Sequence, residues 1–335
     1  MKVLIVSQPE VGRLLPMPEC MAAMAEALAA LARGEAVLPL RQVVRLPDGR
    51  GVLGAMPAYV GPLGVVGLKA ITVFPGNHGT ELDSHQGAVL LFEAGRGRLL
   101  AVMDATSITA IRTAAVSGVA TRLLAREDAG DLAILGTGVQ ADTHLEAMRL
   151  VRPLRRVRVF SRDPGRVRAF AERASKRHGI AVEPAATARD AVAGADIVCT
   201  VTSSAEPVLK GEWIAPGAHV NAVGACMPAC RELDTAAVVR SRLFVDRRES
   251  ALGEAGDFLI PKREGAIGDD HIQGEIGEVL LGRAPGRRSR EEVTLFESLG
   301  LAVEDVASAH VVYRNAVATG GGTWVELGGA RHEGA

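Results

Sequence analysis

The stretch Leu135-Gly136-Thr137-Gly138-Val139-Gln140-Ala141 decides the fold of this chain, because it closes a predicted strand and opens a predicted helix. Gly136 allows the tight turn, Gly138 lets the main chain approach a pyrophosphate, and Ala141 allows the helix to pack closely on the strand. The N-terminus of such a helix presents N–H groups and a positive dipole end to phosphates. The stretch therefore predicts a dinucleotide-binding turn, with a plain strand–helix turn as the alternative.

Around this turn, strand and helix patterns alternate in a way typical of a parallel sheet. Short apolar runs recur along the chain, and the segments between them are long enough for helical crossovers. The predicted strands lie at 131–135, 157–160, 180–182, 196–201, 218–223 and 242–245. This alternation predicts a doubly wound α/β domain of the Rossmann type.

The segments on either side of this domain have a different pattern. Residues 19–33 predict a helix, and the runs at 40–46, 51–57, 65–74, 87–93 and 99–103 predict strands separated by turn residues. Long helices are expected over 106–124 and 302–318, and the tail 323–327 predicts one last strand. These segments together predict an α+β part.

Composition excludes several classes of function. The 335 residues carry 38 Lys+Arg and 39 Asp+Glu, so a basic surface for nucleic acid is not expected. No run approaches the roughly 20 apolar residues that span a bilayer, so no membrane partner is expected. The four cysteines lack a CxxC pair, which predicts neither a disulfide framework nor a metal site. A cytoplasmic protein is the expectation.

The end of the second Rossmann strand bears on which cofactor binds. An NAD site is expected to place an acidic residue at this strand tip, where it accepts a hydrogen bond from the ribose 2′-hydroxyl. Ser161 and Arg162 stand there instead, which suits a 2′-phosphate. We therefore favour NADP(H), with NAD(H) possible. In the alternative interpretation Arg162 is a solvated charge and Asp163 caps the helix that begins at Pro164.

Three cationic side chains stand out in the N-terminal third. Arg41 follows Pro39 in a predicted strand, and Lys69 lies within the apolar run Val65–Val73. Burial lowers the pKa of an amine, which suits a catalytic lysine; a lysine with a buried stem and a solvated ammonium is the alternative. Arg112 offers a planar guanidinium for a carboxylate or a pyrophosphate.

A series of short sequence motifs extends along nearly the whole chain. They are Lys69, Ser84-His85-Gln86-Gly87, Asp104 with Ile108-Thr109, Arg112-Thr113-Ala114-Ala115 with Ser117-Gly118, the turn at 136–141, Arg231-Glu232-Leu233-Asp234, Glu254-Ala255-Gly256-Asp257, Glu275-Ile276-Gly277-Glu278 and Thr294–Gly300. In these segments the chain resembles the ornithine cyclodeaminase/mu-crystallin family.

The resemblance implies an α/β fold in which a Rossmann domain is inserted into an α+β domain. Residues 1–113 with 309–335 would form the substrate-binding and dimerisation domain of a homodimer, and residues 114–308 the NAD(P)-binding domain. The strand at 323–327 would then return to the first domain.

The resemblance also implies a set of site residues. The substrate-binding residues are Arg41, Lys69 and Arg112; Glu254 is a second-line candidate, with a turn residue as the alternative. The residues that match cofactor contacts are Ser84, His85, Arg112, Thr113, Gly136, Gly138, Val139, Gln140, Ser161, Arg162, Thr202, Val223 and Ser298.

One position departs from the cyclodeaminase pattern. Where cyclodeaminases carry an Asp in the loop after the fifth Rossmann strand, this chain has Cys226. A thiol has no fixed negative charge with which to attract the distal ammonium of ornithine. The loop is therefore more similar to the mu-crystallin and imine-reductase branch, and Cys226 is expected to be a small packing residue rather than a reactive thiol.

These observations predict an NAD(P)H-dependent oxidoreductase that reduces a small α-imino acid, such as pyrroline- or piperideine-2-carboxylate, or an α-keto acid to an L-amino acid. Lys69 would be the catalytic proton donor, and Arg41 and Arg112 would hold the carboxylate. One alternative is an ornithine cyclodeaminase that forms proline and ammonia with bound NAD. Another is a mu-crystallin-like protein that binds NADPH and a ligand without turnover.

Overall fold

The computed structural model describes residues 2–77 and 79–329, which form two compact units. The first unit contains the chain up to Arg112 and the chain from Leu301 onward, and the second contains Thr113–Gly300. Helix α3 (Ala105–Leu124) runs through the boundary at Arg112. The prediction of an α/β fold with a Rossmann-type domain is confirmed by the strand order of the two sheets.

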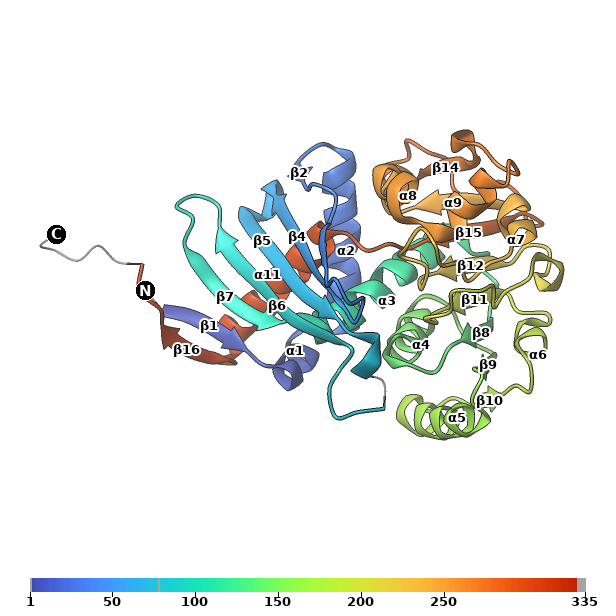
Figure 1. Ribbon diagram of the computed structural model, residues 1–335, viewed down its shortest axis with the longest axis horizontal. Helices are drawn as coiled ribbons and strands as arrows, with labels where there is room; N and C mark the ends of the chain where they lie inside the picture. Colours follow the sequence, from blue (N-terminus) through green and yellow to red (C-terminus); the bar gives the residue numbers. More distant parts are fainter. Residues whose placement is uncertain (1, 78, 330–335) are drawn as a thin grey trace, which may run out of the picture. The chain divides into compact units, whose positions relative to one another are not determined.

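The first unit is a mixed sheet with helices on one face (Figure 1). The strand order is β16-β1-β7-β6-β5-β4-β2, with β3 paired to β4. The strands are β1 (Lys2–Val6), β2 (Ala36–Val37), β3 (Gln42–Arg45), β4 (Val52–Val60), β5 (Val65–Val73), β6 (His85–Glu93), β7 (Leu99–Asp104) and β16 (Thr323–Glu326). The helices are α1 (Gln8–Leu14), α2 (Met17–Ala32) and α11 (Ala302–Thr319), with 3₁₀ turns at Gly61–Leu63 and Pro75–Asn77.

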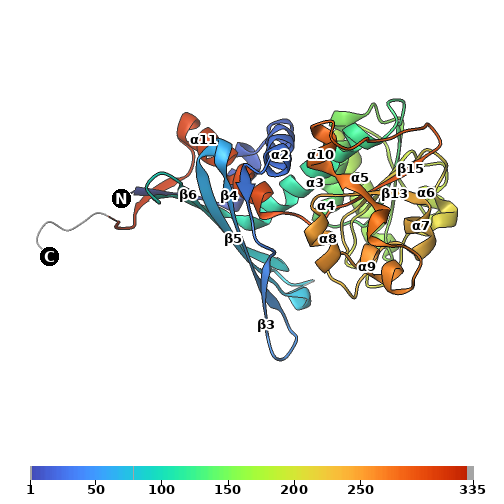
Figure 2. The same cartoon turned by 90° about the horizontal axis from the view of Figure 1, so that it is seen from above.

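The C-terminal strand returns to the N-terminus, as predicted. Strand β16 pairs antiparallel with β1, with Lys2 opposite Glu326 and Ile5 opposite Thr323. Helix α11 then packs across β4, β5 and β6. Gly67 permits this close approach, because a Cβ there would lie 2.6 Å from a methyl group of Val306. The β3–β4 hairpin extends away from the helices (Figure 2).

The N-terminal part differs from the predictions at two places. Helix α1 begins at Gln8, directly after β1, where no helix was predicted. Proline is favoured in a first helical turn, and Glu10 completes a capping box with Ser7. The strand expected over 40–46 is shorter, so that Arg41 lies one residue before β3. In the described part of the chain no single helix is long and apolar enough to cross a membrane, although α1 and α2, bent by 81°, meet these criteria as a pair.

The second unit is a parallel sheet with the strand order β10-β9-β8-β11-β12-β15-β13-β14 (Figure 1). The strands are β8 (Asp131–Leu135), β9 (Arg156–Phe160), β10 (Val182–Pro184), β11 (Ile197–Thr200), β12 (His219–Ala222), β13 (Ser241–Val245), β14 (Ile272–Glu275) and β15 (Val293–Glu297). The helices are α4 (Val139–Val151), α5 (Pro164–His178), α6 (Ala188–Val192), α7 (Thr235–Val239), α8 (Arg248–Glu254), α9 (Gly256–Arg263) and α10 (Ile276–Leu280), with 3₁₀ turns at Gly211–Trp213 and Asp269–His271.

This sheet has the order expected of a dinucleotide-binding fold, extended at one edge. Strands β9 and β10 lie on one side of β8, and β11 and β12 lie on the other. The order therefore reverses beside β8, where such sheets bind their ligand. The third strand begins two residues later than predicted, at Val182, and β14 and β15 were not predicted as strands. Apolar side chains such as Leu135, Val198, Val220 and Leu295 form its core.

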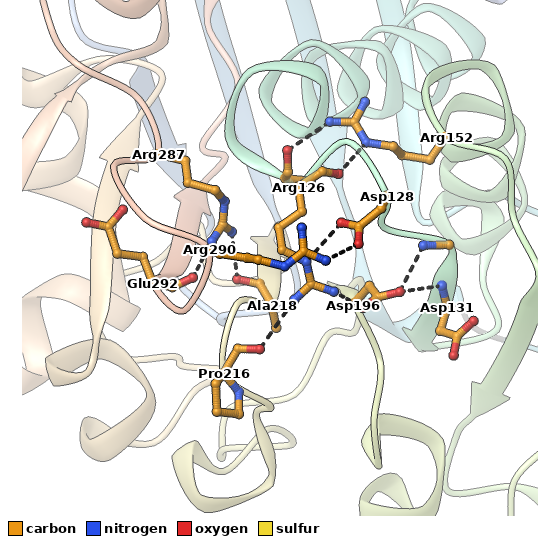
Figure 3. Close-up of polar contacts among 12 residues, drawn as sticks. Arg126, Asp128, Asp131, Arg152, Asp196, Pro216, Ala218, Arg287, Arg290 and Glu292 are labelled. Atoms are coloured by element: carbon orange, nitrogen blue, oxygen red, sulfur yellow. Dashed lines mark hydrogen bonds and ion pairs between the residues drawn. The ribbon is translucent and has the colours of Figure 1, made fainter.

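The buried Arg152 and the half-buried Arg287 hold the C-terminal end of α3 in the second unit (Figure 3). Arg152, 8% exposed, donates hydrogen bonds to the carbonyl oxygens of Arg126 (2.8 Å), Ala125 (2.9 Å) and Thr121 (3.2 Å). The carbonyl of Leu124 accepts from Arg287 at 2.7 Å. The last carbonyls of a helix have no partner within the helix, and cations are favoured beside them.

Replacement of Arg152 by alanine should destabilise the second unit, because three buried carbonyl groups lose a charged donor. We expect the free energy of unfolding to fall by about 3 kcal/mol in urea titrations. Arg168→Ala is the control, because Arg168 is exposed on α5 and should change stability by less than about 0.5 kcal/mol. Equal stabilities of the two variants would contradict this role of Arg152.

Candidate active site

Lys69 occupies the middle of β5, on the sheet face that α11 covers. Its side chain is 2% exposed, and its Nζ lies 2.8 Å from Oδ2 of Asp305 and 3.5 Å from Oγ1 of Thr109. Burial lowers the pKa of Lys69 to about 8, although the adjacent Asp305 carboxylate opposes this shift. The positive charges of Arg112 and Arg41 contribute to the lowering of this pKa. Lys69 is therefore an amine poised to exchange a proton near neutral pH.

Arg112 lies in α3 and faces two carboxylates of α11. Its Nη1 donates to Oε2 of Glu304 at 2.8 Å, and its Nε donates to Oδ1 of Asp305 at 3.0 Å. Glu304 and Asp305 are fully buried, in the first turn of α11, where the helix dipole favours negative charge. Asp305 thus contacts both Lys69 and Arg112, and the four side chains form one buried ionic cluster within the first unit.

Sequence reasoning did not single out Glu304 and Asp305. The signal was present, because two acidic residues interrupt the apolar run Leu301–Ala309 at the start of a predicted helix. The structure brings Lys69 and Arg112 together through Asp305, and Glu304 contacts Arg112. It places Glu254 in the second unit, at the end of α8, and Arg41 in a half-buried position before β3.

The glycine-rich turn connects β8 to α4 and has the conformation expected of a phosphate-binding loop. Gly136 has φ +126°, and a Cβ there would lie 2.7 Å from the carbonyl oxygen of Val201. Gly138, the N-cap of α4, has open space where its Cβ would be. Ala141 is fully buried. Open space at the exposed Gly138 therefore lies directly before the positive end of α4, and this cradle fits a pyrophosphate.

At the tip of β9, Arg162 is exposed and Asp163 caps α5, which are the features that the alternative interpretation of this segment predicted. The Ser161 hydroxyl accepts from Oγ1 of Thr137 at 3.2 Å, next to the turn, and Arg162 is exposed. Asp163 caps α5 by accepting from the backbone N–H groups of Gly165 (2.8 Å) and Arg166 (3.1 Å). Asp163 is thereby held at the helix start, and Arg162 is the charged residue presented beside Ser161.

The remaining predicted cofactor residues lie in both units. Thr202, Val223 and Ser298 follow the carboxyl ends of β11, β12 and β15 in the second unit. The buried Ser298 hydroxyl has no hydrogen-bond partner among the described residues, as expected of a group that contacts a ligand. Thr113 begins the second unit, whereas Ser84 and His85 lie at the start of β6 in the first, where their side chains are 3.0 Å apart.

Cys226 is half-buried in the loop after β12. Its Sγ lies 3.5 Å from the carbonyl oxygen of Val223 and 3.8 Å from that of Leu299. Both contacts use the thiol as a donor to the main chain. This environment suits the packing role expected from the sequence better than that of a reactive thiolate.

The chain is similar over its full length to known proteins. Residues 1–320 match the model of the ornithine cyclodeaminase/mu-crystallin family. The ketimine reductase mu-crystallin of Mus musculus is 43% identical over 84% of this chain and 85% of that protein.

Solved structures agree with this assignment. The Δ1-pyrroline-2-carboxylate reductase of Thermococcus litoralis, in complex with NADH and L-proline, superimposes with a TM-score of 0.94 and 38% identity, covering 96% of this chain and 99% of that one. An archaeal alanine dehydrogenase dimer with bound NAD gives a TM-score of 0.92 and 36% identity, covering 98% of this chain and 100% of that one. The chain therefore belongs to the ornithine cyclodeaminase/mu-crystallin family.

Proposed function

We propose that this chain is an NAD(P)H-dependent oxidoreductase that reduces small α-imino acids, above all cyclic ketimines such as pyrroline- and piperideine-2-carboxylate, to L-amino acids. The buried cluster around Lys69 carries the proposal, because it provides a protonated amine of lowered pKa beside a guanidinium. The relatives named above act on substrates of this class. The proposed reaction also requires a bound dinucleotide, and the turn at 136–141 would hold its pyrophosphate.

The proposed mechanism assigns a distinct task to each group. The turn at 136–141 would hold the pyrophosphate of a nicotinamide cofactor, which when bound would provide the hydride for the imine carbon. Lys69 donates the proton that balances the reaction to the imine nitrogen, and Asp305 holds its ammonium in place at 2.8 Å. Arg112 and Arg41 hold the substrate carboxylate, because a planar guanidinium can bind both carboxylate oxygens.

The direct test follows NADPH and NADH oxidation with pyrroline-2-carboxylate, piperideine-2-carboxylate and a panel of α-keto acids with ammonia. We expect stoichiometric oxidation and formation of L-proline or L-pipecolate with the cyclic imines. Cofactor binding without turnover over the whole panel would instead favour a binding protein.

A cyclodeaminase activity is the other outcome to test. We expect no proline from L-ornithine, because the Cys226 thiol donates to main-chain carbonyls and offers no carboxylate for the distal ammonium. The assay supplies catalytic NAD⁺ with L-ornithine and measures ammonia and proline. Release of ammonia and proline without net formation of NADH would show that the chain is a cyclodeaminase and not a reductase.

We propose a preference for NADP(H), supported by Ser161 and the exposed Arg162. NADPH should bind at least about tenfold more tightly than NADH, because a guanidinium–phosphate contact is a charged hydrogen bond. Arg162→Ala should remove most of this difference, as measured by titration of cofactor fluorescence. Equal affinities in the wild type would contradict the preference.

We also propose that the protein is a homodimer that associates through the open face of the first unit's sheet. Directly opposed residues of β4, β5, β6, β7 and β1 form an apolar row on the face opposite Lys69, namely Pro57, Leu68, Leu90, Val102 and Ile5. All of these side chains are partly or largely exposed. Leu90→Glu should give a monomer in sedimentation velocity, and a wild-type monomer would contradict the proposal. Location in the cytoplasm stays a prediction.

A further inference from the structure

Glu232 is a fully buried carboxylate that the mechanism above does not use. Its Oε1 accepts hydrogen bonds from the backbone N–H and the hydroxyl of Thr202, both at 2.6 Å. Its Oε2 accepts from the backbone N–H of Gly224 at 2.7 Å. One side chain thus joins two loops that are 22 residues apart in sequence, as the numbers of Thr202 and Gly224 show.

The two loops follow neighbouring strands at the ligand-binding edge of the second sheet. Thr202 comes after β11 and Gly224 after β12, and these strands are paired in parallel. Both lie on the side of β8 away from β9 and β10 (Figure 1). In a doubly wound sheet the β8–β9 side takes the adenosine half of a dinucleotide, and the β11–β12 side takes the other half. Glu232 therefore acts on the nicotinamide half.

The loops are also in close contact with each other. A Cβ at Gly224 would lie 2.0 Å from the carbonyl oxygen of Thr202 and 2.7 Å from the Glu232 carboxyl carbon. Any movement of one loop must therefore be transmitted to the other.

The main chain of Glu232 is itself held in place. Its N–H and that of Leu233 donate to Oδ1 of Asp257, at 3.0 and 2.8 Å. Its carbonyl oxygen accepts from the N–H groups of Val208 (2.7 Å) and Leu209 (2.9 Å). The carboxylate is therefore presented from a rigid base, as a group that must hold two loops in register requires.

We propose that Glu232 is a positioning residue that sets the geometry of the nicotinamide half of the cofactor site by clamping the loops at Thr202 and Val223-Gly224. This inference rests on the proposed dinucleotide binding. Because backbone N–H groups only donate, the clamp needs an acceptor at both ends. A carboxylate meets this requirement, and a carboxamide meets it at one end only.

The test compares Glu232→Gln with Glu206→Gln, whose glutamate is exposed in the segment after β11. In the first variant the amide NH₂ must face the backbone N–H of either Gly224 or Thr202, so one of these two hydrogen bonds is lost and the clamp is weakened. We expect the Kd of NADH and of NADPH to rise about tenfold, with a matching rise in cofactor KM. The Kd of ADP-ribose, which lacks the nicotinamide, should change less than about twofold. Glu206→Gln should resemble the wild type in all three measurements.

The outcomes separate positioning from general structural damage. Equal loss of NADH and ADP-ribose affinity, or no loss of either, would overturn the proposal. Glu232→Asp keeps both acceptor oxygens on a shorter side chain and should also weaken NADH binding selectively, which covers the case in which Glu232→Gln fails to fold. If neither variant folds, Glu232 is required for stability and the proposal fails. Failure of the wild type to bind NADH and NADPH would instead refute the proposed function.

Discussion

Lys69→Met should lower kcat for imine reduction by about 100-fold or more, with the affinity for NADPH almost unchanged. Methionine has a similar length and no proton to donate, and Asp305 keeps its contact with Arg112 at 3.0 Å. Lys176→Met, at an exposed position of α5, is the matched control and should retain full activity. Circular dichroism and thermal unfolding verify that both variants are folded. Near-normal turnover by folded Lys69→Met would exclude Lys69 as the proton donor.

The same lysine predicts the pH dependence of the reaction. Reduction requires the protonated amine, so kcat/KM should fall as the pH rises through the Lys69 pKa of about 8. The Asp305 carboxylate raises this pKa, so Asp305→Asn should move the descending limb to lower pH. The profile is measured with saturating NADPH. A limb that stays in place in Asp305→Asn would show that another group is titrating.

Gly138→Ala and Gly136→Ala should separate cofactor binding from folding. A Cβ added at Gly138 would enter the open space of the cradle, so NADPH affinity should fall about tenfold or more, while the free energy of unfolding without cofactor changes by less than about 1 kcal/mol. Gly136 has φ +126° and its Cβ would meet the oxygen of Val201, so Gly136→Ala should also lose about 3 kcal/mol of stability.

Cofactor titrations and urea unfolding, each performed on both variants, provide the comparison. Wild-type affinity in Gly138→Ala would show that no pyrophosphate lies against this turn. Unchanged stability in Gly136→Ala would show that the turn relaxes without strain.

Much of the architecture could be predicted from the residues because it depends on local backbone properties. The turn at 136–141 needs a residue with positive φ and a position without a side chain, and these are properties of glycine itself. The parallel sheet could be predicted because the alternation of short apolar runs with helical segments is likewise visible in the local sequence. Helix α1 was not predicted, because it is short and has Pro9 in its first turn.

The charged cluster depended on the tertiary structure. Glu304 and Asp305 are 192 and 193 positions from Arg112, and nothing in either segment specifies the partner of the other. Packing of α11 on β5 buries Lys69 and both carboxylates together, and burial forces the charges to pair. The same holds for Glu232, which connects loops that only parallel strand pairing brings together. The sequence by itself thus determined the backbone frame and its dinucleotide turn, whereas the partner of each buried charge was decided by long-range packing.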